Sequence, residues 1–243
     1  MDNELNTNTS RRRFLGTLTT GAAAMSMAGI LSPLQQIRAG QASTTKETND
    51  PNPEEWLKKI NGKHRIVFDV TQPHGIFPFA WPKVFLMTNA ATGTPEKDCS
   101  VVVVLRHDAI GYAMEDRLWK KYNFAEVFNA KDHGPAFQAS DAAQAVSFRN
   151  PFWKPSKGDF KVPGIGEVQI GINELQDNGV IFTVCQAAMT VYSNAVAAGM
   201  NMGASEVLDD WRSGLLPGIY QVPSGVWAIG RAQEKGCGYC FAG

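Results

Sequence analysis

Residues 179–199, GVIFTVCQAAMTVYSNAVAAG, change from an apolar run to an alanine-rich one around a single cysteine, Cys185. The run 180–184 is short, apolar and rich in β-branched residues, which is typical of a buried strand. The following segment, 187–198, predicts a helix that ends at Gly199. A strand and a helix joined directly are a building unit of α/β proteins, and here the cysteine lies at the junction.

The same alternation continues on both sides of this unit. Residues 101–106, VVVVLR, are nearly all apolar, which is typical of a strand buried on both faces of a parallel sheet. Further strands are predicted at 66–70, 219–222 and 238–242, and further helices at 82–92, 113–123, 166–179, 205–214 and 224–236. Strands that alternate with helices in this way predict an α/β fold. We expect a single-domain three-layer sandwich with a mostly parallel five-stranded sheet.

The N-terminal segment has the features of an export signal. Residues 1–42 contain a basic cluster with Arg11 and Arg12, then a weakly apolar stretch, then small residues suited to cleavage. Paired arginines followed by Phe14 favour the twin-arginine pathway, so we expect a periplasmic or otherwise exported protein that meets the twin-arginine translocase. Residues 43–54 predict a flexible linker.

The remaining residues, 55–243, have the length of one domain with a sizeable core. Within them, 125–163 is rich in proline and aromatic residues and predicts a long insertion over the surface, pinned by Phe148, Phe152 and Trp153. Lysine and arginine number 23 in the whole chain and aspartate and glutamate also 23, so no basic footprint indicates nucleic acid. No long apolar run follows the export signal, so no transmembrane segment is expected in the mature chain.

Candidate functional residues gather where the predicted strands end. Sites in open parallel sheets form beyond the carboxyl ends of the strands. His74 follows the first strand, His107 the second, Cys185 the third and Ser224 the fourth. Cys185 also opens a helix, whose partial positive charge favours a thiolate. The residue is therefore either a reactive thiol, with His107 as its helper, or a small buried core residue.

A second cysteine motif, CGYC, ends the chain with Cys237 and Cys240. The pair enters a strand instead of opening a helix, which disfavours a thioredoxin-like role. A disulfide, metal or cluster ligation, and free thiols all remain open for it, and Cys99 and Cys185 are candidate disulfide partners. No Gly-x-Gly-x-x-Gly follows the first strand, and neither a Walker loop nor Gly-x-Ser-x-Gly occurs, so nucleotide binding and α/β-hydrolase chemistry have no sequence signal.

Two stretches resemble the DsrE/DsrF-like family of sulfur-metabolism proteins. They are GVIFTVCQAAM at 179–189 and LLPGIYQVPSGVWAIGRAQEKGCGYC at 215–240, and VVVVLRH at 101–107 looks like the family's second strand and its histidine. The resemblance implies a parallel five-stranded sheet and assembly into trimers or hexamers. It also implies that the cysteine matching Cys185 accepts a persulfide and hands it on.

Three functions are consistent with these features. The first is an exported protein that binds or transfers sulfur through Cys185, helped by His107. The second is a periplasmic metal- or cofactor-binding protein in which His74, His107 and Cys185 converge, a donor set that suits copper, zinc or iron. The third is a non-catalytic oligomeric binding module. The sulfur reading requires no cofactor, and the sequence names none.

Overall fold

The computed structural model describes residues 52–130, 149–162 and 164–243. Their main strands are β1 (His64–Val70), β2 (Cys99–Leu105), β5 (Ile181–Cys185), β6 (Ile219–Val222) and β7 (Gly238–Phe241), with a short hairpin of β3 (Lys161–Val162) and β4 (Gly166–Glu167). The helices are α3 (Phe77–Ala91), α4 (Asp116–Tyr122), α5 (Phe124–Val127), α7 (Ile172–Asp177), α8 (Gln186–Met200), α9 (Ala204–Ser213) and α10 (Gly225–Glu234). Short 3-10 helices are η1 (Glu55–Lys59), η2 (Glu96–Asp98) and η3 (His107–Ala113).

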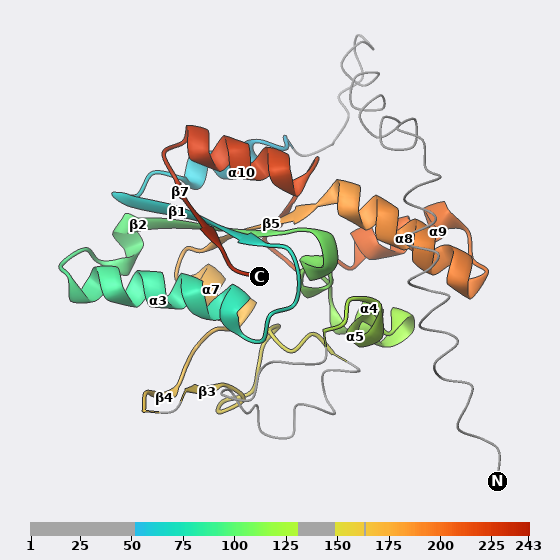
Figure 1. Ribbon diagram of the computed structural model, residues 1–243, viewed down its shortest axis with the longest axis horizontal. Helices are drawn as coiled ribbons and strands as arrows, with labels where there is room; N and C mark the ends of the chain where they lie inside the picture. Colours follow the sequence, from blue (N-terminus) through green and yellow to red (C-terminus); the bar gives the residue numbers. More distant parts are fainter. Residues whose placement is uncertain (1–51, 131–148, 163) are drawn as a thin grey trace.

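The five main strands form one sheet in the order β6-β5-β2-β1-β7, and every pairing in it is parallel. The chain steps from β1 to β6 in one direction, so right-handed crossovers put the intervening helices on one face. It then returns past β1 to form β7, which puts α10 on the opposite face. Figure 1 shows α10 on one side of the sheet and α3 and α7 on the other. The predicted three-layer α/β sandwich with a five-stranded parallel sheet is confirmed.

Alternate residues of the central strands supply two separate cores. Phe68, Val103 and Phe182 pack with α3, α7 and α8 in the larger core. Val67, Val102 and Ile181 face the other way and pack with η1 and α10 in the smaller one. Central strands buried on both faces explain why VVVV in β2 is a continuous apolar run.

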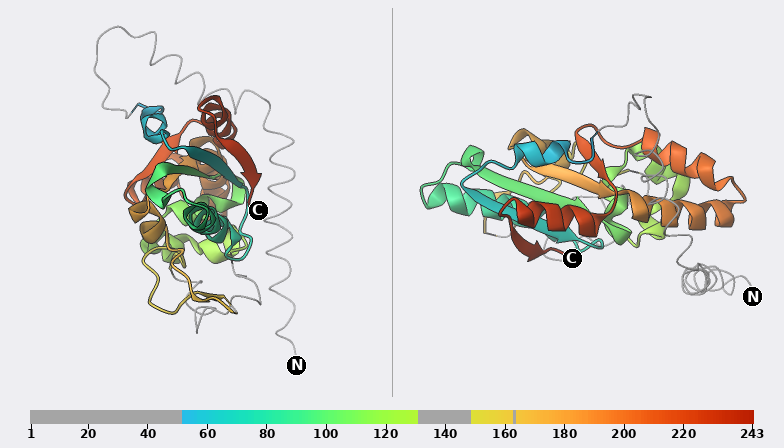
Figure 2. Two further views of the ribbon diagram at one scale, coloured as in Figure 1. Left: turned by 90° about the vertical axis from the view of Figure 1, so that its left-hand side faces the viewer. Right: turned by 90° about the horizontal axis from the view of Figure 1, so that it is seen from above.

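The α8–α9 pair extends past the carboxyl ends of the strands instead of lying back across the sheet (Figures 1 and 2). Its support is a cluster of aromatic side chains from α4, α5 and α9. Phe124 and Trp211 pack edge to face with ring centroids 5.0 Å apart, and Tyr122 stacks on Phe124 at 5.8 Å. We call α4, α5, α8 and α9 the helical annex.

Several elements differ from the sequence predictions. The helix expected at 113–123 is the shorter α4, since Ala113 belongs to the preceding η3, and the one expected at 166–179 contains only α7 after the β3–β4 hairpin. Most of the expected insertion, with Phe148, lies outside the described residues. Phe152 is fully buried and stacks on Phe79 with ring centroids 4.0 Å apart, whereas Trp153 is only partly buried. The insertion is therefore anchored to the larger core through Phe152.

The predicted signal segment 1–42 and nearly all of the linker 43–54 also lie outside the described residues. Within the described ranges, no helix combines the length and the apolar composition needed to cross a bilayer.

Candidate functional site

All five parallel strands end at one edge of the sheet, as predicted, and this carboxyl edge holds the candidate residues. Cys185 is the last residue of β5, His107 begins η3 just after β2, and Ser224 is the N-cap of α10 after β6. His74 lies in the turn between β1 and α3. The structure therefore places each of these residues at the end of the sheet that the alternation predicted.

Cys185 is the N-cap residue of α8. Its Sγ accepts a hydrogen bond from the backbone N–H of Ala188 at 3.3 Å, and the residue is 6% exposed. Neither an aspartate nor a glutamate occupies the first turn of α8 to offset the positive end of the helix. The cysteine carries no disulfide. The thiol is thus free of any disulfide, accepts a hydrogen bond at the N-terminus of α8, and is almost completely buried.

A charged network of Arg106, Asp69 and Tyr239 also lies at this edge. The Arg106 guanidinium donates from Nε and Nη2 to the two carboxylate oxygens of Asp69, at 2.6 and 2.9 Å. The Tyr239 hydroxyl donates to Asp69 Oδ2 at 2.9 Å. The Asp69 side chain is 4% exposed and that of Arg106 27%. The carboxylate is therefore paired on both oxygens, and the Arg106 side chain is partly exposed.

Arg106 and Cys185 are neighbours across adjacent strands. Leu105 of β2 is in register with Val184 of β5, so the next residue of each strand comes to the same edge. The pKa of Arg106 is raised first by its hydrogen bond to Asp69, burial acts against this, and the charges of Asp69, Tyr239 and Cys185 add to the increase. The thiol thus lies within electrostatic reach of the guanidinium.

The start of α10 packs directly on Arg106. A Cβ atom on Gly225 would lie 2.6 Å from Arg106 Cβ, so only glycine fits at this position. Ser224 accepts from the Trp227 N–H at 3.2 Å, which confirms the predicted N-cap. The backbone N–H of Ala187 in α8 donates to the Pro223 carbonyl at 3.2 Å. The N-terminal ends of α8 and α10 therefore lie side by side, as expected of helices that follow neighbouring strands.

His107 occupies a separate cluster with Asp108 and Tyr192. Its backbone is left-handed, with φ of 50°, and its imidazole is 62% exposed and lies 3.1 Å from the Asp108 carboxylate. The Tyr192 hydroxyl donates to Asp108 and is 3.4 Å from both His107 ring nitrogens. Burial and then Asp108 raise the pKa of Tyr192 well above its usual range. Among the described residues, no hydrogen bond or ion pair joins His107 to Cys185, so the expected direct pairing is not formed.

The three-ligand metal site expected from His74, His107 and Cys185 is also not formed. No group of three His, Cys, Asp or Glu side chains within the described ranges lies close enough to hold a metal ion. The His74 ring packs on Phe77 with centroids 5.2 Å apart, and its Cβ lies close to Gly243. His74 therefore belongs to the packing at the β1 and β7 ends.

Cys237 and Cys240 point to opposite faces of the sheet. Cys237 packs in the smaller core under α10, and Cys240 packs against the larger core. Both are free thiols, as is Cys99, and burial raises the pKa of each of the three. For the CGYC motif the structure thus has neither a mutual disulfide nor ligation by three side chains.

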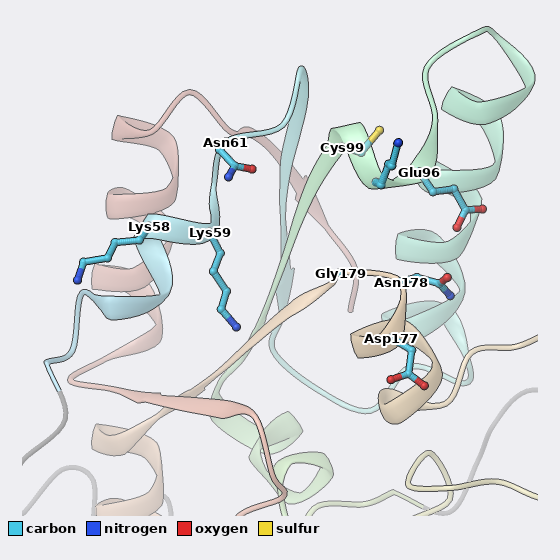
Figure 3. A pocket seen from close by; sticks show the side chains of 9 residues that line it. Lys58, Lys59, Asn61, Glu96, Cys99, Asp177, Asn178 and Gly179 are labelled. Atoms are coloured by element: carbon cyan, nitrogen blue, oxygen red, sulfur yellow. The ribbon is translucent and has the colours of Figure 1, made fainter.

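A cavity of about 610 Å³ lies at the opposite, amino edge of the sheet. Figure 3 shows its lining, with Lys58 and Lys59 from η1 on one side and Glu96 and Asp177 on the other. Of the cysteines, only Cys99 lines it. Lys58 is paired with Glu55 at 2.7 Å, and Lys83 with Glu96 at 3.2 Å. This mixed-charge hollow is not part of the carboxyl edge, where the candidate residues lie.

Sequence reasoning missed Arg106, Tyr239 and Tyr192. Arg106 had a signal, because it is the charged residue that ends the apolar run of β2 at the predicted edge. Tyr192 also had one, since it lies on α8 two turns after Cys185 and so shares a helix face with it. Tyr239 had none, because its contact with Asp69 depends on β7 pairing with β1.

Comparisons with known proteins add no relative to this description. No protein-family model matches the chain, and no curated protein sequence is significantly similar to it.

Proposed function

We propose that this chain is an exported DsrE/DsrF-like protein that binds and transfers sulfur through Cys185. The observation that carries the proposal is the free Cys185 thiol at the N-cap of α8, on the carboxyl edge of a parallel sheet and beside Arg106. Reactive cysteines in proteins are typically found at helix N-termini and near cationic side chains. The motif resemblance supplies the class of chemistry.

The proposed step exchanges one sulfur–sulfur bond for another. The Cys185 thiolate attacks the terminal sulfur of a persulfide, R–S–SH. A bond forms between Sγ and that sulfur, the S–S bond of the donor breaks, and the donor leaves as R–S⁻. Cys185 then holds Cys–S–SH, and a second thiolate takes the terminal sulfur by the same reaction. His107 is left out of this step because it has no contact with Cys185.

The test is intact mass of the folded protein after exposure to an alkyl persulfide. We expect wild type to gain one sulfur atom, removable by reductant, and Cys185→Ser to gain none. Cys240→Ser is the matched control, because Cys240 is also a free thiol and is less buried than Cys185. It should load like wild type. Loading that survives in Cys185→Ser, or no loading of wild type, would contradict the proposal.

Export by the twin-arginine pathway is a second part of this proposal and rests on Arg11 and Arg12. We expect the full chain to reach the periplasm of a bacterial host, and Arg11→Lys with Arg12→Lys to keep it in the cytoplasm. Arg38→Lys is the control, since it lies outside the motif. Cell fractionation measures the distribution, and equal export of the double variant would contradict the assignment.

The proposal includes a homo-oligomer, a trimer or hexamer, as the resemblance implies. Its structural support is an apolar surface on α3, where Trp81, Val84 and Met87 are each at least 40% exposed. Apolar side chains grouped on an outer surface are typical of subunit contacts. Light scattering of the mature protein measures the mass. Trp81→Glu with Val84→Lys should reduce the mass to that of a monomer, and an unchanged oligomer would exclude this surface.

A further inference from the structure

Strand β7 forms one edge of the main sheet, and its side chains do not protect that edge. Among the described strands, β1 alone pairs with it. Figure 2 shows β7, the dark red arrow, at the rim of the sheet. Tyr239 is 50% exposed and Phe241 57%, although both side chains are large and aromatic. Natural sheets usually guard an edge with charged residues or proline, and Gly238–Phe241 contains neither.

The backbone hydrogen-bonding groups of Tyr239 and Phe241 point away from β1. Phe241 is in register with Asp69, and the Asp69 carbonyl accepts from the backbone N–H of Ala242 at 2.9 Å. Since the N–H and C=O groups of a strand turn to its two sides alternately, residues 240 and 242 face β1, and residues 239 and 241 face outward. The Phe241 carbonyl receives a weak contact from the Cys240 thiol at 3.6 Å. The outer edge thus offers donors and acceptors in the spacing of a strand.

A second copy of β7 that runs antiparallel to the first matches this edge. In the register that places the two Cys240 residues opposite each other, Tyr239 of each copy lies opposite Phe241 of the other. Each of these pairs exchanges two backbone hydrogen bonds and brings two aromatic side chains together on one face of the sheet. A register shifted by two residues would place Tyr239 or Phe241 opposite a residue outside β7. One register therefore uses all of the outward groups of the strand.

The charges near β7 favour the antiparallel arrangement. Arg65 and Lys235 lie at the start of the strand, where Arg65 Nη1 donates to the Lys235 carbonyl at 2.7 Å. A parallel pairing of two copies would place these cations side by side, where they would repel one another. An antiparallel pairing separates them to the two ends of the contact. It also closes on itself, because both copies use the same edge.

We propose that β7 pairs antiparallel with β7 of a second copy, so that the two main sheets become one continuous sheet with a two-fold axis at Cys240. The inference rests on the proposed homo-oligomer and adds a contact distinct from the α3 surface. With α3 joining copies into trimers, β7 joins two trimers into a hexamer. A contact of four residues on each side is small. It is therefore weak between two single copies and stable where several such contacts act together.

A lysine at position 241 tests the contact through the mass of the oligomer. We expect light scattering to give a hexamer for wild type and a trimer for Phe241→Lys, because lysine on an edge strand opposes pairing. Ile165→Lys is the matched control, since Ile165 is 66% exposed and lies between β3 and β4. It should remain a hexamer. A hexameric Phe241→Lys, with cooperative thermal unfolding to show that it is folded, overturns the inference.

Cys240 provides a second test that reports the register. The two Cys240 residues would form a non-hydrogen-bonded pair with Cα atoms about 4.5 Å apart, which is within the range of disulfide bonds. Diamide should oxidise the two thiols to one disulfide and itself be reduced to the hydrazine, giving a chain pair on a non-reducing gel. Cys240→Ser should give no pair, and Phe241→Lys should lower its yield about tenfold. Ile165→Lys should keep the wild-type yield. The absence of a Cys240–Cys240 peptide by mass spectrometry overturns the proposed register.

The mass of wild type separates this inference from the proposed function. A trimeric wild type that still loads sulfur contradicts the β7 contact alone. A dimer that Phe241→Lys converts to a monomer supports the β7 contact and contradicts the α3 surface. A monomeric wild type contradicts both contacts, while sulfur loading at Cys185 is measured independently of either.

Discussion

Thr183 places a hydroxyl in the centre of the sheet, between Val104 of β2 and Tyr220 of β6. The residue is fully buried, and in the described part of the chain its Oγ1 has no hydrogen-bond partner. A buried hydroxyl left unpaired costs about 1–3 kcal/mol relative to one that is satisfied or absent. Position 183 therefore suits an apolar side chain of the same shape better than threonine.

We predict that Thr183→Val raises the free energy of unfolding by about 1 kcal/mol, because valine keeps the branched shape and removes the unpaired hydroxyl. Thr190→Val is the matched control. Its hydroxyl donates to the Gln186 carbonyl at 3.0 Å, so the same exchange should lower stability by about 0.5 kcal/mol. Urea unfolding of both variants measures the difference. A loss of stability in Thr183→Val would indicate that the hydroxyl is satisfied in solution.

At the scale of single residues, the sequence predicted the position of Cys185 but not the contacts of its neighbour Arg106. The switch from a β-branched run to an alanine-rich one located Cys185 at a strand–helix junction, because both patterns are local. Arg106 is the charged residue that follows the neighbouring strand. The orientation of the Arg106 side chain depends on Asp69, Tyr239 and Gly225. Those contacts join residues 37 to 170 positions apart in the chain, so no local pattern contains them.

The N-terminus of α10 is the element whose placement fixes Arg106. The helix starts with Gly225 against the Arg106 side chain and contains a second glycine, Gly230, whose Cβ would meet nothing within 4 Å. The two positions thus separate the effect of close packing from the effect of helix propensity within one helix.

We predict that Gly225→Ala destabilises the protein by about 2 kcal/mol, since the new methyl group displaces Arg106 from Asp69 or displaces the helix. Gly230→Ala should stabilise it by about 1 kcal/mol, because alanine is the better helix former and has free space there. Thermal unfolding measures both. Equal stabilisation by the two changes would contradict the close contact with Arg106.

Element types were easier to predict than element positions. All five strands were located from apolar runs and glycine boundaries, and Ser224 was identified as an N-cap from its residue type. The helix expected at 113–123 was wrong at its start, because Ala113 ends the 3-10 helix η3 and α4 begins only at Asp116. The sequence did not predict that β7 pairs with β1 or that α8 and α9 extend past the sheet. Both features depend on packing between segments that are distant in the chain.

The whole molecule consists of the sandwich and the helical annex that extends from its carboxyl edge. Asp210 of α9 ties the annex together, because it accepts hydrogen bonds from Arg117, Lys121 and Tyr122 of α4, with Lys121 at 2.7 Å and Tyr122 at 2.6 Å. Burial alone would raise the pKa of Asp210, but these hydrogen bonds outweigh it and hold the pKa well below its usual range. Since α8 packs on α9 and begins at Cys185, this cluster also supports the proposed site.

A carboxylate whose pKa is lower in the folded than in the unfolded state stabilises the fold above its unfolded pKa, about 3.9, and loses that contribution as the pH falls. We therefore predict that wild type loses more stability than Asp210→Asn between about pH 5 and pH 2. The difference should be about 1 kcal/mol, because solvent screens the half-exposed Arg117 and Lys121. Urea unfolding at a series of pH values measures it.

The neighbouring residue provides the control for this pH dependence. Asp209 is 71% exposed, and among the residues that the structure describes it pairs only with Arg212 of its own helix, at 3.4 Å. Asp209→Asn should therefore follow the wild-type profile, since an exposed pair within one helix contributes little to stability. If Asp209→Asn flattened the profile as much as Asp210→Asn, the acid sensitivity would reflect net charge. Flattening by Asp210→Asn alone would show that this one carboxylate couples α4 to α9, and through α8 to the end of the sheet where Cys185 lies.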